Sequence, residues 1–227
     1  MTQALLRAFV LVLFAAGGTD ALAQRAVNDG WETDIAAFEE ADRVRPPVAG
    51  GVLFVGSSSI RFWDTLETDF PGMAVVRRGF GGSEVRDATR YAARIVVPHR
   101  PRLVVMYAGD NDLAEGRTPK QVCDDVTAFV ARIREDLPQV AFAWITIKPS
   151  PARANLLDAA REANALVAAW TKTVRDAQVI DIFTPMLDGE GRPREDLYGP
   201  DRLHMNRAGY AVWIERIAPV LKSASKP

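Results

Sequence analysis

The stretch VLFVGSSSI, Val52–Ile60, runs from four apolar residues through one glycine into three consecutive serines. A short apolar run with β-branched residues that ends at glycine is typical of a fully buried strand in a parallel sheet. After Gly56 the chain must turn, and Ser58 falls where a helix would begin, with its own backbone N–H free. The stretch therefore predicts a strand–turn–helix unit with a serine at the turn.

Similar apolar runs recur along the chain and predict a five-stranded sheet. They lie at Val52–Val55, Ala74–Val76, Leu103–Tyr107, Val140–Ile147 and Val179–Phe183. Segments of helical period separate them, and Thr118 to Gln121 opens one such segment as a capping box with Pro119 at the first helical position. Alternating strands and helices predict an α/β three-layer sandwich with a parallel sheet, right-handed crossovers and helices on both faces.

Three further helices are predicted from apolar periodicity and capping residues. One covers Trp31–Asp42 before the first strand, and another carries an apolar face from Ala163 to Val174. The last follows Asn206, a residue type that commonly caps a helix at its N-terminus.

Length and composition bound the possible functions. A chain of 227 residues is suited to one domain with a single core. With 25% charged residues and a net charge of −1, it offers no electrostatic reason to expect nucleic acid or an anionic membrane as a partner, and it leaves the oligomeric state open. Cys123 is the only cysteine, so no intrachain disulfide can form, and we expect a buried thiol in a helix rather than a nucleophile.

The first residues resemble a secretory signal peptide. Arg7 precedes the uncharged stretch Ala8–Thr19, and Ala21-Leu22-Ala23 has the small-x-small pattern of a cleavage site. The apolar run is shorter than the roughly 18–20 residues that a membrane span needs. We therefore expect a signal peptide at residues 1–23, a single domain at 24–227, no stable membrane insertion, and export to the periplasm or the medium.

Polar and glycine-rich segments follow four of the predicted strands. They are Gly56–Ile60, Gly79–Ser83, Gly109–Asp112 and a longer loop that ends in Asp201–His204. In open parallel sheets, ligands bind beyond the carboxyl ends of the strands. These four segments are therefore expected to form one site.

A serine becomes a good nucleophile when a neighbouring base accepts its proton, and histidine is the usual base. The chain has two histidines, and His99 precedes the third strand, at the opposite edge of the sheet. His204 is therefore the predicted base. Asp201, three residues earlier, can accept the other ring N–H and fix the tautomer. Among the serines, Ser58 fits the nucleophile position, whereas we expect the Ser57 hydroxyl to brace the loop and Ser59 to begin the buried helix face.

Acyl transfer also needs hydrogen-bond donors for the oxyanion that develops on the carbonyl. Gly82 has no Cβ and can bring its backbone N–H close to a ligand, and Asn111 supplies a side-chain amide. The Ser58 backbone N–H at the predicted helix start is a third candidate.

At these residues the sequence resembles the SGNH (GDSL-like) hydrolases, from about Trp31 to the C-terminus. The matching blocks are Phe54–Arg61, Arg78–Ser83, Gly109–Asp112 and Asp201–Asn206 with Gly209-Tyr210. The resemblance implies a flavodoxin-like sandwich, a triad of Ser58, His204 and Asp201, and an oxyanion hole formed by Ser58, Gly82 and Asn111. It implies hydrolysis of a small-molecule carboxylic ester through an acyl-enzyme on Ser58, with a short-chain acyl, acetyl-sugar or lysophospholipid-like substrate and with no metal or organic cofactor.

The sequence departs from the family pattern at two positions. Ser57 stands where the family has the acidic residue of GDSL, and Arg77 stands where an Asn is common near the second block. Both departures leave the three triad residues in place. They concern the support of the loops that carry Ser58 and Gly82.

Other functions fit the sequence less well. A non-catalytic flavodoxin-like protein, with its serine-rich loop around a phosphate, or a carbohydrate-binding protein on the same fold would leave the pairing of Asp201 with His204 unexplained. An ordinary α/β-hydrolase is disfavoured because the chain has no G-x-S-x-G motif. The acidic loop Asp188–Gly191 lacks the alternating oxygen ligands of a calcium loop and is interpreted as a solvated loop.

Overall fold

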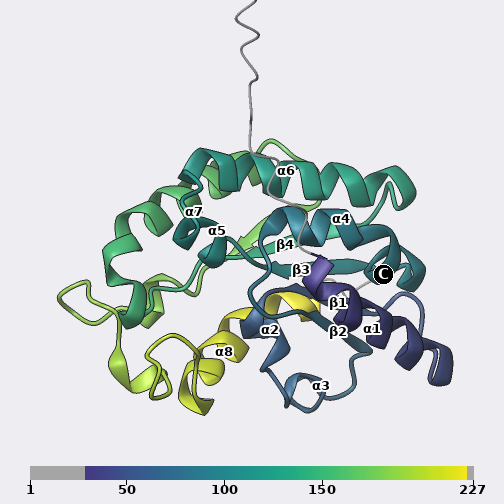
Figure 1. Cartoon of the computed structure of the whole chain (residues 1–227), viewed down its shortest axis with the longest axis horizontal. Helices are drawn as coiled ribbons and strands as arrows, with labels where there is room; N and C mark the ends of the chain where they lie inside the picture. Colours follow the sequence, from purple (N-terminus) through teal and green to yellow (C-terminus); the bar gives the residue numbers. More distant parts are fainter. Residues whose placement is uncertain (1–28, 224–227) are drawn as a thin grey trace, which may run out of the picture. The chain divides into compact units, whose positions relative to one another are not determined.

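Five parallel strands form one sheet in the order β2-β1-β3-β4-β5 (Figure 1). The strands are β1 (Val52–Gly56), β2 (Val75–Gly79), β3 (Leu103–Tyr107), β4 (Ala141–Ile145) and β5 (Ala177–Ile180). This computed structural model describes residues 29–223, so the predicted signal peptide lies outside the described residues. The strand order is that of flavodoxin-like folds and confirms the predicted architecture.

Helices cover both faces of the sheet. The α-helices are α1 (Glu32–Val44), α2 (Ser58–Arg61), α3 (Leu66–Asp69), α4 (Val85–Ile95), α5 (Asp110–Ala114), α6 (Pro119–Asp136), α7 (Leu157–Thr171) and α8 (Arg207–Ser223). Short 3-10 helices occur at η1 (Asp29–Trp31), η2 (Val97–His99), η3 (Pro151–Leu156), η4 (Thr184–Met186) and η5 (Glu195–Leu197). Side chains of α1, α4, α6 and α7 share one core with the sheet, and those of α2, α3 and α8 share the other (Figure 1).

Alternate residues of each central strand enter opposite cores. In β1, Leu53 and Val55 pack beneath α4 and α6, whereas Val52 and Phe54 pack toward α8. All four side chains are fully buried. Burial on both faces explains why the central strands are continuous apolar runs without alternating polar residues. No helix within residues 29–223 is long and apolar enough to cross a membrane.

The edge strands differ from their predicted bounds. β2 continues to Gly79 through Arg77 and Arg78, two charged residues that end the apolar run in the sequence but are tolerated at the edge of a sheet. β5 ends at Ile180, before the predicted end at Phe183. The backbone N–H groups of Ile182 and Phe183 donate instead to the Thr146 hydroxyl, at 2.9 and 3.0 Å, and so leave the ladder.

The predicted helix caps are confirmed. The Thr118 hydroxyl accepts from the Gln121 backbone N–H at 3.2 Å, and the Gln121 side chain accepts from the Thr118 N–H at 2.9 Å. At the start of α8, the Asn206 side chain accepts backbone N–H bonds from Ala208 and Gly209. The helix that was expected to reach Val174 ends at Thr171.

A buried carboxylate joins α3 to α8. Asp69 accepts hydrogen bonds from the guanidinium of Arg207, at 2.5 and 2.7 Å, from Trp63 Nε1 at 2.7 Å and from the Thr65 hydroxyl at 2.8 Å. The hydrogen bonds from Arg207 in particular lower the Asp69 pKa from 3.8 to about 2. Because Arg207 follows His204 closely in the chain, this contact also anchors the loop that carries the histidine.

Asp69→Asn should lower the free energy of unfolding by about 2 kcal/mol at pH 7, measured by urea denaturation. The carboxylate's contribution is fully present above its unfolded pKa and is lost as the pH falls toward about 2. The difference between variant and wild type should therefore be smaller at pH 3 than at pH 7. Asp196→Asn, which removes an exposed pair with Arg194, is the control and should change little at either pH. An equal loss for Asp69→Asn at both pH values would contradict this account.

Candidate active site

Ser58 is the first residue of α2 and directly follows the turn that ends β1. The turn is possible because Gly56 has φ of 145°, and a Cβ at that position would lie 1.8 Å from the Tyr107 carbonyl oxygen of the neighbouring strand. The backbone N–H of Ser57 then donates to the same carbonyl at 3.1 Å. Of the three serines, Ser57 and Ser59 are buried, and only Ser58 is partly exposed.

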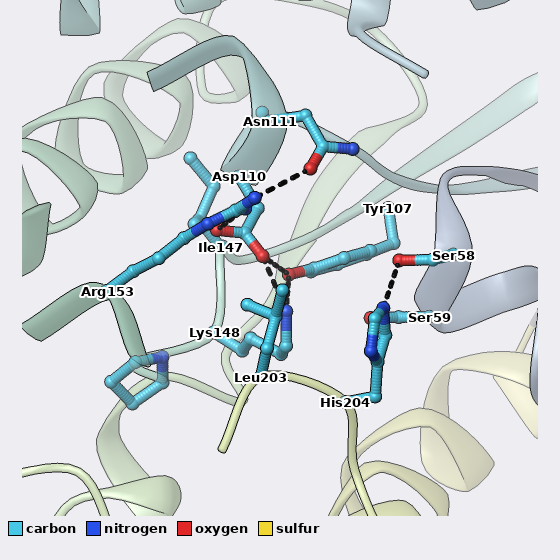
Figure 2. A network of polar contacts seen from close by, with 12 residues as sticks. Ser58, Ser59, Tyr107, Asp110, Asn111, Ile147, Lys148, Arg153, Leu203 and His204 are labelled. Atoms are coloured by element: carbon cyan, nitrogen blue, oxygen red, sulfur yellow. Dashed lines mark hydrogen bonds and ion pairs between the residues drawn. The ribbon is translucent and has the colours of Figure 1, made fainter. Parts of the chain in front are cut away.

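A chain of hydrogen bonds links Ser58 to His204 and Asp201. The Ser58 Oγ lies 2.9 Å from His204 Nε2 (Figure 2), and His204 Nδ1 lies 2.6 Å from Asp201 Oδ2. The second Asp201 oxygen accepts the backbone N–H groups of Leu203 and His204, at 3.0 and 2.9 Å. The structure therefore places the three predicted triad residues together in the expected order.

The environment of Asp201 decides which imidazole nitrogen carries the proton. The side-chain hydrogen bond from His204, with the two backbone N–H bonds, lowers the Asp201 pKa from 3.8 to about 2. An ionised carboxylate only accepts hydrogen bonds, so Nδ1 must donate. In the neutral imidazole Nε2 is then unprotonated and can accept the Ser58 hydroxyl proton.

Phe62 contacts the imidazole and was not singled out from the sequence. Its ring meets that of His204 edge to face, with the centroids 4.9 Å apart and an angle of 85° between the planes. Phe62 is also 50% exposed, which is unusual for a large apolar residue in this chain. A phenylalanine within one helical turn of Ser58 is the sequence signal that could have suggested this contact. Trp63, in contrast, is fully buried and belongs to the core.

The backbone N–H groups of Ser58 and Gly82 make no hydrogen bond within the described residues, 29–223. Neither N–H group is therefore used by the fold itself. Gly82 has a φ of +77°, and a Cβ at this position would meet no atom within 4 Å. Glycine is favoured here because of the left-handed backbone conformation and not because a side chain would clash.

The Asn111 side chain makes two hydrogen bonds that fix its orientation. Its Nδ2 donates to the Ser83 carbonyl at 3.0 Å, and its Oδ1 accepts from Arg153 Nη2 at 3.1 Å. In Figure 2 the amide oxygen points toward Arg153 and the amide nitrogen points away from it. One of the two hydrogens on Nδ2 remains for a ligand.

Buried hydrogen bonds hold the loops that carry Gly82 and Asn111. Trp31 Nε1 donates to the Gly81 carbonyl at 2.8 Å. The Asp112 carboxylate accepts from the Val85 and Gly109 backbone N–H groups, both at 3.0 Å, and so joins the two loops. Complete burial raises the Asp112 pKa from 3.8 to about 7.

The two departures from the family pattern have structural explanations. The Ser57 hydroxyl makes no hydrogen bond that caps α2, whereas the Ser57 backbone N–H donates to the Tyr107 carbonyl and supports the loop. Arg77 donates to the Arg61 carbonyl at 3.1 Å and pairs with Asp64 at 3.0 Å. It therefore supports the end of α2 and not the loop of Gly82.

A buried cluster of charges lies beneath Asn111, and sequence analysis missed it. Lys148 Nζ lies 2.5 Å from Asp110 Oδ2 and 3.1 Å from the Tyr107 hydroxyl, and Arg153 Nη1 lies 2.6 Å from Asp110 Oδ1 (Figure 2). Burial would raise the Asp110 pKa, but the charges of Lys148 and Arg153 outweigh it and hold that pKa below its usual value. The available signal was a lysine at the end of an otherwise apolar run, Ile147-Lys148.

The remaining sequence candidates lie apart from Ser58. His99 is buried and contacts Arg78 and Asp42, each at 3.2 Å. Burial raises the pKa of the Cys123 thiol, which is unfavourable for a nucleophile. Asp188 pairs with Arg192 in its own loop at 3.0 Å. The part of the chain that the structure describes holds no group of three or more His, Cys, Asp or Glu side chains that could bind a metal ion.

Known structures share this fold. A protein from Streptococcus pneumonia, provisionally assigned as a platelet activating factor, superposes with a TM-score of 0.75 at 16% identity, over 84% of this chain and 92% of its own. A GDSL-like lipase from Bacteroides thetaiotaomicron gives 0.70 at 22% identity, over 86% and 97%. A family 3 carbohydrate esterase from Clostridium thermocellum gives 0.61 at 15% identity, over 77% and 98%.

The family of the chain is set by its sequence. No curated protein matches the chain. The model of the GDSL-like lipase/acylhydrolase family, however, matches residues 48–212. That region includes the three strand ends that carry Ser58, Gly82 and Asn111, and also the loop of Asp201 and His204. The chain therefore belongs to the GDSL-like lipase/acylhydrolase family and is a hydrolase that acts on ester bonds.

Proposed function

We propose that this protein is an exported serine esterase that hydrolyses short-chain or water-soluble carboxylic esters through an acyl-enzyme on Ser58. One observation carries the catalytic part of the proposal. The Ser58 hydroxyl lies 2.9 Å from His204 Nε2, and the other ring nitrogen, Nδ1, lies 2.6 Å from the Asp201 carboxylate. A non-catalytic binding protein on the same fold would leave this arrangement without a role.

In the first half of the reaction, Ser58 Oγ attacks the ester carbonyl carbon while His204 Nε2 takes the hydroxyl proton. Negative charge develops on the carbonyl oxygen, which accepts hydrogen bonds from the Ser58 and Gly82 backbone N–H groups and from Asn111 Nδ2. The tetrahedral intermediate collapses as the bond to the alcohol oxygen breaks. His204 gives its proton to that oxygen, and the acyl group remains on Ser58.

In the second half, a water molecule attacks the acyl carbon and His204 Nε2 takes a proton from it. The same three donors stabilise the second tetrahedral intermediate. Collapse breaks the bond to Ser58 Oγ, which recovers its proton from His204, and the carboxylic acid leaves. Asp201 stays ionised throughout, because its pKa of about 2 lies far below neutral pH, and it stabilises the imidazolium that forms twice in each cycle.

The surface around Ser58 favours small acyl groups. Within residues 29–223, the exposed large hydrophobic side chains are Val44, Val48 and Phe62, and of these Phe62 alone contacts the triad. A long acyl chain would need a wider apolar surface to compensate for its removal from the core of a micelle or bilayer. Acetyl groups on sugars belong in the test set because the fold resembles that of a carbohydrate esterase.

Export is supported by the sequence pattern at residues 7–23, a basic residue followed by an uncharged stretch and a small-x-small site. N-terminal sequencing of protein recovered from the periplasm or the medium tests it. The expected first residue lies close to Gln24. A recovered protein that keeps residues 1–23 would refute cleavage.

Ser58→Ala should lower kcat on nitrophenyl acetate by at least about four orders of magnitude, since it removes the nucleophile of a triad. Ser57→Ala and Ser59→Ala change neighbouring hydroxyls that are buried and should keep kcat within about tenfold of wild type. Circular dichroism of all three variants checks the fold. Comparable losses in all three variants would contradict the assignment of Ser58.

The specificity constant should fall as the acyl chain lengthens. We expect kcat/KM on nitrophenyl acetate to exceed that on nitrophenyl decanoate, and Ser58→Ala serves as the blank. Acetylated sugars and lysophospholipid, assayed in parallel, separate the candidate substrate classes. A kcat/KM that rises steadily with chain length would show that an apolar acyl site exists and would refute the preference for short chains.

A further inference from the structure

We infer that Arg153 is a positioning residue for ester hydrolysis, because it holds the Asn111 amide in the one orientation that presents Nδ2 to the oxyanion. This inference rests on the proposed function of Asn111. Arg153 lies in η3, in the segment that follows β4, 42 residues beyond Asn111, and it is absent from the sequence blocks that characterise the site.

A side-chain amide has a hydrogen-bond acceptor on one side and a donor on the other. An asparagine side chain can turn by about 180° and exchange its donor for its acceptor at little intrinsic cost. A guanidinium can only donate, so its contact at 3.1 Å requires Oδ1 on the Arg153 side. A carbonyl can only accept, so the 3.0 Å contact with Ser83 requires Nδ2 on the other side. Loss of the Arg153 contact would leave one hydrogen bond to resist the flip.

The guanidinium is itself held by the buried cluster. Its Nη1 lies 2.6 Å from Asp110 Oδ1 while Nη2 binds Asn111, so one planar group spans two consecutive residues of α5. Such fork-like contact is available to arginine and not to lysine. The same loop is tied to the histidine loop, since the Ala152 backbone N–H donates to the Arg202 carbonyl at 3.0 Å.

Arg153 is one of two cations that pair with Asp110. Lys148 already pairs with the other Asp110 oxygen at 2.5 Å, and its side chain is 1% exposed against 22% for Arg153. What Arg153 adds beyond Lys148 is the contact with Asn111. The cluster then carries one more positive than negative charge beside the amide, which polarises it and makes Nδ2 a stronger donor to an oxyanion.

A double-mutant cycle on kcat tests the inference. Asn111→Ala should lower kcat on nitrophenyl acetate by about 10²–10³-fold, as loss of one oxyanion donor does. Arg153→Gln should lower kcat by about tenfold and change KM by less than about threefold, because the contact acts in the transition state. In the Asn111→Ala background, the same change at Arg153 should lower kcat by less than about threefold, because its target is gone.

Arg134→Gln is the matched control. Arg134 is a partly buried arginine whose guanidinium donates to the backbone carbonyls of Val140 and Arg175. These carbonyls lie just before the amino ends of β4 and β5, whereas Ser58 follows the carboxyl end of β1. This change should reduce the thermal midpoint and leave kcat unchanged. If Arg153→Gln does not fold, Arg153→Lys keeps a positive charge at Asp110 and runs the same cycle.

The outcomes separate this inference from the proposed function. If Asn111→Ala lowers kcat as expected but Arg153→Gln has no effect, or has the same effect in both backgrounds, the positioning role is refuted and the esterase mechanism stands. If Asn111→Ala itself leaves kcat unchanged, the oxyanion role of Asn111 fails and the role of Arg153 fails with it. A tenfold loss that disappears in the Asn111→Ala background supports the inference.

Discussion

The site depends on the register in which three parallel strands pair. Gly56 at the end of β1 is aligned with Gly79 at the end of β2 on one side and with Tyr107 at the end of β3 on the other. The chain leaves all three strands at one level of the sheet edge, so the segments that follow meet there. Ser58, Gly82 and Asn111 each lie within a few residues of such an end. A shift of this register by one residue would move the side chains of each strand from one core to the other and would separate Ser58, Gly82 and Asn111.

Two kinds of interaction keep that edge rigid. Backbone contacts act close to the strands, as where Gly56 allows the Tyr107 carbonyl to approach and to bind the next N–H. Buried carboxylates connect the loops. Asp112 accepts hydrogen bonds from the segments that carry Gly82 and Asn111, and Asp110 forms ion pairs with two cationic side chains beneath them. Under the proposed mechanism, hydrogen-bond donors that are fixed before the reaction need no reorganisation when negative charge develops on the substrate. The buried charged groups therefore fix the positions of the site residues and also contribute to the electrostatic potential at the site.

The sequence predicts most of the fold and the centre of the site. Central strands such as β3 are continuous apolar runs, and Asp201 with His204 is a local pair whose spacing is visible in the chain. The rest depends on contacts between distant residues. β5 ends where the next backbone N–H groups donate to the Thr146 hydroxyl. β2 continues through two arginines, which interrupt the apolar pattern in the sequence but are tolerated in an edge strand. Arg153 meets Asn111, and Phe62 meets His204, only because loops from separate strands converge. No local pattern encodes how a loop crosses the sheet edge.

In the proposed mechanism, Ser58 forms the covalent intermediate. Treating the active protein with a fluorophosphonate, followed by proteolysis and tandem mass spectrometry, locates the nucleophile directly, because the reagent traps an activated serine as a stable adduct. We expect one adduct per chain, on Ser58, formed in step with the loss of activity and absent from the His204→Ala variant, where no base activates the hydroxyl. An adduct on Ser57 or Ser59, or full inhibition without an adduct on Ser58, would contradict it.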